Sequence, residues 1–197
     1  MNMSMCRLGC IGLLAVAFAA TPMLVSCDSA TKVADMAKSV GLDPAQLASK
    51  LGSVSGDVGG LSGSMNELLA KAGTDPKGAI DKFSAAAKSF TADNSAVSGA
   101  LNKLGANPDV LKSWLGGAGS KASPEQLKAL TDSMSKFGAD SSKFQGVLND
   151  VTGKLMKNPT ADGINGLKGA FSELSTSGKS LGGSADSLAK QLKGLMG

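Results

Sequence analysis

The sequence contains no histidine and no tyrosine, and its only arginine is Arg7. Without histidine, neither a Ser-His-Asp set nor a Cys-His pair can be assembled for nucleophilic catalysis. Histidine is also the usual nitrogen ligand of zinc, so a metal site of that kind is excluded. Arginine is the preferred residue for bidentate contacts with phosphates and bases, and its scarcity argues against nucleic acid as a partner.

Cysteine is nearly as scarce, and the last of the three cysteines closes an apolar N-terminal segment. Arg7 precedes an uncharged run over residues 8–26, which is typical of an export signal. The run ends in Leu24-Val25-Ser26-Cys27. This motif resembles the lipobox of bacterial lipoproteins, in which an aliphatic residue, a variable residue and a small residue precede cysteine.

The resemblance implies specific chemistry at Cys27. The thiol would take a diacylglyceryl group as a thioether, and the small Ser26 would let the signal peptidase reach the bond before Cys27. Acylation of the new amino terminus, with a fatty acid such as palmitate, would follow. Because two or more acyl chains make a stable membrane anchor, we expect residues 1–26 to be a cleaved signal peptide. Residues 27–42 would then be the lipidated N-terminus and a tether.

Two features of this segment have alternative interpretations. Residues 8–26 make a run of 19, just long enough for an uncleaved membrane helix, although Pro22 and the alanine content favour the lipoprotein signal. Asp28 is similar to the residue that retains enterobacterial lipoproteins in the inner membrane. It is equally well explained as the first solvated residue of a linker.

Removing residues 1–26 leaves 171 of the 197 residues, enough for one domain with its own core. This part carries 19 lysines against 16 acidic residues, which indicates a mixed, solvated surface. Cys6 and Cys10 lie in the signal segment, so the mature chain cannot form an internal disulfide or a thiolate metal site. No acidic cluster resembles a cation site, and we predict no metal and no cofactor.

Four prolines mark predicted helix starts. Each follows a residue that can cap a helix, in the pairs Asp43-Pro44, Asp75-Pro76, Asn107-Pro108 and Ser123-Pro124. Proline suits the first helical position, because its missing N–H is not needed there. The first three prolines are also spaced at intervals of 32 residues, which indicates an internal repeat.

Apolar residues recur in steps of three and four along residues 47–72, 80–104, 127–155 and 164–195. This heptad-like alternation is typical of packed helices such as coiled coils, and no stretch has the period of two that strands need. Short connections place successive helices antiparallel. We therefore predict an all-α fold, in which residues 43–197 form an antiparallel bundle of about four long amphipathic helices. A short connecting helix over residues 108–115 and a glycine-rich loop over residues 116–120 complete it.

The middle of each predicted helix is unusual. Asn94, Ser141 and Gly178 interrupt three of the apolar seams near their centres. The first helix has glycines near its own centre: Gly56, Gly59, Gly60 and Gly63. Three interpretations are open, namely a narrow waist of small residues, a polar layer that fixes the register, and a pocket for a ligand.

No residues form a recognisable catalytic set, although composition alone leaves Ser-Lys chemistry open. Trp114 is interpreted as a cap on the bundle end or as an exposed contact for lipid or a partner.

We expect a lipid-anchored protein of the bacterial cell envelope that faces the periplasm or the cell surface. Its role would be structural or protein-interacting, without catalysis, and its partners would be the membrane and another envelope protein. The alternatives are a module that holds an apolar ligand or lipid within the bundle, and a membrane-active protein whose helices open onto the bilayer.

Overall fold

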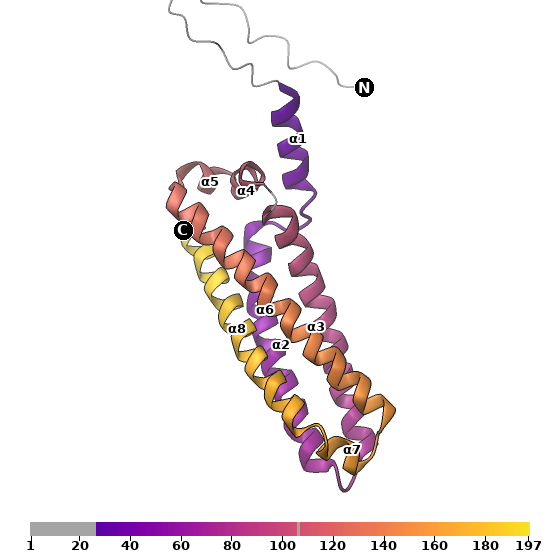
Figure 1. The fold of residues 1–197 in the computed structure, drawn as a ribbon. Helices are drawn as coiled ribbons and strands as arrows, with labels where there is room; N and C mark the ends of the chain where they lie inside the picture. Colours follow the sequence, from indigo (N-terminus) through magenta and orange to yellow (C-terminus); the bar gives the residue numbers. More distant parts are fainter. Residues whose placement is uncertain (1–26, 106) are drawn as a thin grey trace, which may run out of the picture.

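The computed structural model describes residues 27–105 and 107–197, with side chains from Thr31 onward, and within these ranges it contains helices and no strand. Four long helices form an antiparallel bundle (Figure 1), which confirms the predicted all-α fold. They are α2 (Pro44–Lys71), α3 (Pro76–Gly105), α6 (Pro124–Lys157) and α8 (Lys168–Met196). The short helices are α1 (Cys27–Lys38), α4 (Pro108–Leu115), α5 (Gly117–Lys121) and α7 (Ala161–Asn165).

The capped prolines begin four of these helices, as predicted. The Asp43 carboxylate accepts a hydrogen bond from the Gln46 backbone N–H at 2.7 Å, and the Asp43 backbone N–H donates to the Gln46 side-chain oxygen Oε1. Ser123 and Gln126 form the same capping box at α6. Asp75 and Asn107 accept from backbone N–H groups in the first turns of α3 and α4. Each cap satisfies donors that would otherwise lack a partner in the first turn.

The four long helices occupy the corners of a square. α2 packs closely against both α3 and α8, and α6 packs closely against α8. The fourth side, between α3 and α6, is the least closely packed. The α4–α5 segment lies across one end of the bundle and α7 lies at the other end (Figure 1). The order around the square is therefore α2, α3, α6, α8, with every neighbouring pair antiparallel.

The predicted apolar seams meet in one core. Phe83, Phe90 and Phe137 are fully buried, and Phe90 packs edge-to-face on Phe144 with ring centroids 4.8 Å apart. Leucine and valine side chains from all four long helices fill the space around them. The period of three and four thus puts the apolar stripe of every helix on the bundle axis.

Two local predictions are wrong. The helix predicted to run through residues 164–195 is broken after α7, because Gly166 ends the turn that Thr160 caps. Residues 116–120 are not a loop: Gly116, with φ +59°, ends α4, and α5 begins at the next residue. Gly119 fits there because a Cβ would collide with the Lys112 carbonyl oxygen.

An ion-pair network on the α2–α3 hairpin predicts that the free energy of unfolding depends on pH. Lys71 and Lys82 donate to the Glu67 carboxylate at 2.8 and 2.7 Å, and these hydrogen bonds lower the pKa of Glu67 to about 2. Because the folded pKa lies below the unfolded value, the stabilisation is complete above about pH 4.5. It is lost as the pH falls toward 2.

We expect Glu67→Gln to lower the free energy of unfolding at pH 7, and this difference from the unmodified protein to shrink between about pH 4.5 and pH 2. Urea melts at several pH values measure it. The matched control is Glu173→Gln, because the described residues place no ion pair at Glu173. A Glu67→Gln difference that persisted unchanged at pH 2 would contradict the assignment.

Candidate functional site

The predicted anchoring residue begins α1. This helix projects from the α4–α5 end of the bundle, and its first residue is Cys27 (Figure 1). The remaining lipobox residues, Leu24 to Ser26, and the alternative membrane helix at residues 8–26 lie outside the described residues. Asp28 lies in the first turn of α1. The structure therefore places the Cys27 backbone at the tip of a projecting helix.

α1 is joined to the bundle by a packed junction. Ala37 and Val40 are buried, and the Trp114 indole N–H donates to the Leu42 carbonyl oxygen at 2.6 Å. From α3, the Lys103 ammonium donates to the Ser39 carbonyl oxygen. Trp114 is only 9% exposed. The interpretation of Trp114 as a cap on the bundle end is thus confirmed, and the exposed alternative is wrong.

The three mid-helix residues do not form one layer. Asn94 and Ser141 are buried, and the Asn94 amide donates to the Ser141 hydroxyl at 2.7 Å between α3 and α6. Gly178 instead lies against apolar neighbours, since a Cβ there would be 2.9 Å from Val58 Cγ1 and 3.1 Å from Phe144 Cε2. The interpretation as a polar contact is therefore confirmed for Asn94 and Ser141 between α3 and α6. The interpretation as close packing at a small residue is confirmed for Gly178 of α8.

The glycines near the centre of α2 do not contribute to a waist. They are exposed, and a Cβ at any of them would meet nothing within 4 Å: Gly56, Gly59, Gly60 and Gly63. They lie on the outer face of the helix, opposite the apolar stripe. The prediction that they bring helix backbones together is wrong.

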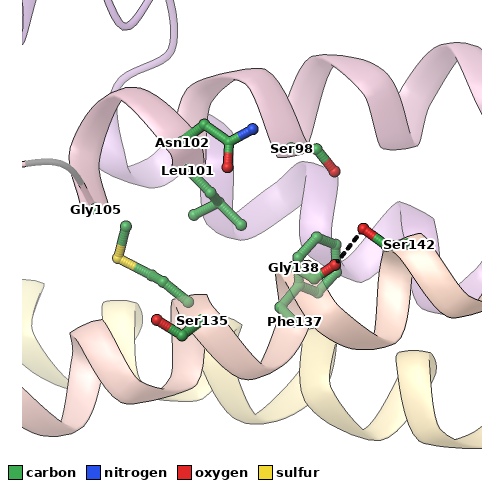
Figure 2. A pocket seen from close by; sticks show the side chains of 9 residues that line it. Ser98, Leu101, Asn102, Gly105, Ser135, Phe137, Gly138 and Ser142 are labelled. Carbon is green, nitrogen blue, oxygen red and sulfur yellow. Dashed lines mark hydrogen bonds between the residues drawn. The ribbon is translucent and has the colours of Figure 1, made fainter.

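A groove of about 290 Å³ lies between α3 and α6 (Figure 2). It carries no charged side chain, and most of its lining is small or polar: Ser98, Leu101, Asn102, Gly105, Met134, Ser135, Phe137, Gly138 and Ser142. Ser98 also lies 3.3 Å from the Ser141 hydroxyl, so the groove adjoins the buried polar contact. The sequence signal for this groove is the set of small, uncharged residues beside the apolar seams of α3 and α6.

A second polar cluster bridges α6 and α8. The Ser184 hydroxyl donates to the Asp140 carboxylate, and Lys136 donates to both, at 3.0 Å to Ser184 and 2.7 Å to Asp140. Burial raises the pKa of Asp140, but the hydrogen bonds from Lys136 and Ser184 outweigh it and hold the pKa below its usual value. A Ser-Lys nucleophile needs a desolvated, neutral lysine. Here the Lys136 side chain is 65% exposed and paired with a carboxylate, so the cluster is a structural link between the helices.

Among residues 27–105 and 107–197, no group of histidine, cysteine, aspartate or glutamate side chains is arranged to hold a metal ion. Within the same part of the chain, no helix has the length and apolar character needed to cross a bilayer.

No known protein family matches the chain, and no curated protein or solved structure is significantly similar to it.

Proposed function

We propose that this protein is a lipid-anchored component of the bacterial cell envelope, attached through Cys27, with a structural or protein-interaction role. The observation that supports the proposal best is that α1, which begins at Cys27, projects away from one end of the bundle. Acyl chains on that residue would enter a bilayer without crossing the packed core. The lipobox resemblance of Leu24-Val25-Ser26-Cys27 supplies the chemistry of attachment.

The geometry suits a protein that holds a surface away from a membrane. An α-helix rises 1.5 Å per residue, so the 12 residues of α1 span about 18 Å and the 34 residues of α6 about 51 Å. An anchor at Cys27 would turn the α4–α5 end toward the bilayer and present the α7 end to the periplasm or the cell exterior. The junction at Trp114 keeps the base of α1 in contact with the bundle.

Attachment is tested with the full-length chain expressed in bacteria and labelled with palmitate. We expect the unmodified protein to incorporate label and Cys27→Ser to incorporate none, because serine lacks the thiol that forms the thioether. Cys10→Ser is the matched control, since that residue lies in the segment expected to be removed, and it should be labelled like the unmodified protein.

The fractionation of the same variants gives a second measurement. The unmodified protein should partition with membranes and into detergent, and Cys27→Ser should lose the acyl-dependent part of that partitioning. Label retained in Cys27→Ser would overturn the lipoprotein proposal.

A further inference from the structure

The four sides of the bundle differ in how closely their helices pack and in how the chain connects them. α2 and α3 are linked by the turn at residues 72–75, and α6 leads into α8 through the short α7 segment. α2 and α8 pack closely, with Gly178 directly against Val58. α3 and α6, by contrast, pack least closely and are connected only through the long α4–α5 segment.

Two of the buried polar side chains of the core, Asn94 and Ser141, meet on the α3–α6 side. Asn94 is fully buried, its amide donates to Ser141, and its own carbonyl oxygen Oδ1 has no hydrogen-bond partner in the described part of the chain. A buried polar atom without a partner destabilises the closed state, and contact with water removes that cost. Replacing apolar contacts with a polar pair at this side also leaves less hydrophobic area to hold α3 against α6.

The groove between α3 and α6 reaches this contact from outside. Ser98 lines the groove between α3 and α6 (Figure 2). Its hydroxyl oxygen lies 3.3 Å from that of Ser141. Opening the side at this point would extend the groove inward to Asn94. The next layer along α6 contains Phe144, which packs on Phe90 of α3.

We propose that the α3–α6 side is a built-in opening of the bundle, and that the closely packed α2–α8 side is the spine on which it opens. The two hairpins, α2–α3 and α6–α8, separate along Ser98, Asn94 and Ser141 while each hairpin remains folded. Local opening of this kind occurs where buried apolar contacts are fewest. The movement exposes the Phe90–Phe144 layer, and it does not depend on lipid attachment at Cys27.

The test uses two engineered cystines in residues 27–197 carrying Cys27→Ser, so that each introduced pair holds the only thiols. This part of the chain contains the complete described core. Ser98→Cys with Ser141→Cys bridges the α3–α6 side, where the two hydroxyl oxygens are 3.3 Å apart. Ser55→Cys with Gly182→Cys bridges the α2–α8 side, where Ser55 Oγ is 3.5 Å from the position of a Cβ on Gly182. Each variant is compared in its oxidised and reduced forms by amide hydrogen exchange.

We expect oxidation of the Ser98–Ser141 pair to slow exchange in the middle of α3 and α6 by more than about tenfold, because it locks the opening. Oxidation of the Ser55–Gly182 pair should leave those amides nearly unchanged, since the spine does not move. Equal slowing by both cystines would mean that these amides exchange only by global unfolding, and would overturn the proposal. Slowing by neither would overturn it as well.

A measurement on the chain without engineered pairs stands independently of cystine formation. Amides in the middle of α3 and α6 should exchange faster than amides at the same level of α2 and α8. Uniform protection of the four helices would contradict an opening on one side.

Discussion

Gly178→Leu is expected to destabilise the bundle, even though leucine is the better helix former. The gain in helix propensity is nearly 1 kcal/mol. Against it, the added side chain begins 2.9 Å from Val58 Cγ1 and 3.1 Å from Phe144 Cε2. Val58 is β-branched and stiff, and Phe144 is held by its edge-to-face contact with Phe90. Overpacking of a filled core costs about 1–3 kcal/mol, so the net change should be a loss of stability.

The matched control is Gly183→Leu on the same helix. Gly183 is exposed, and a Cβ there would meet nothing within 4 Å. This substitution therefore gains the same propensity without the overlap, and should be neutral or stabilising by up to about 1 kcal/mol. Denaturant melts of both variants measure the difference. If Gly178→Leu proved as stable as Gly183→Leu, the close approach of α8 to α2 and α6 would be wrong.

Phe90→Ala is expected to cost about 3–5 kcal/mol, the range found when a large aromatic side chain is removed from a core. Phe90 is fully buried, and its ring meets Phe144 across the α3–α6 side at an interplanar angle of 70°. Truncation removes the buried area and leaves a cavity that the surrounding helices fill only in part. The free energy of unfolding from denaturant melts gives the loss directly.

A double-mutant cycle with Phe144→Ala separates the ring contact from simple burial. An edge-to-face pair contributes about 0.5–1.5 kcal/mol beyond area, and the cycle should return a coupling of that size. Phe90→Leu is the control, because it keeps most of the volume and should cost clearly less than Phe90→Ala. Equal losses for Phe90→Leu and Phe90→Ala would show that the cavity does not determine the cost.

The helix starts could be read from the sequence because their causes are local. A capping side chain and the proline after it act within four residues, as in Asp43-Pro44 and Ser123-Pro124. The break after α7 was missed, although its causes are nearly as local. Thr160 caps the short turn of α7 and Gly166 ends it, and the apolar period does not report this turn.

The helical period of the sequence also predicts which way the glycines of α2 face. Gly56 and Gly59 fall between the apolar positions Val54, Val58 and Leu61, so the helical period already directs them outward. The structure shows them exposed, as that period requires. These glycines form no waist, because their positions on the helix, and not their number, decide which way they face.

The sequence by itself determined that Asn94, Ser141 and Gly178 lie on the inner stripes of their helices, because burial in a helix follows from the period alone. Only the tertiary structure decided what each residue meets there. Contact between helices depends on their order around the bundle and on how far each is shifted along its axis. The apolar pattern of a single helix determines neither of these. That arrangement pairs Asn94 with Ser141 on the loosely packed α3–α6 side. The same arrangement sets Gly178 of α8 against Val58 of α2 and Phe144 of α6, on the closely packed sides of the bundle. Phe144 lies one helical turn after Ser141 on α6.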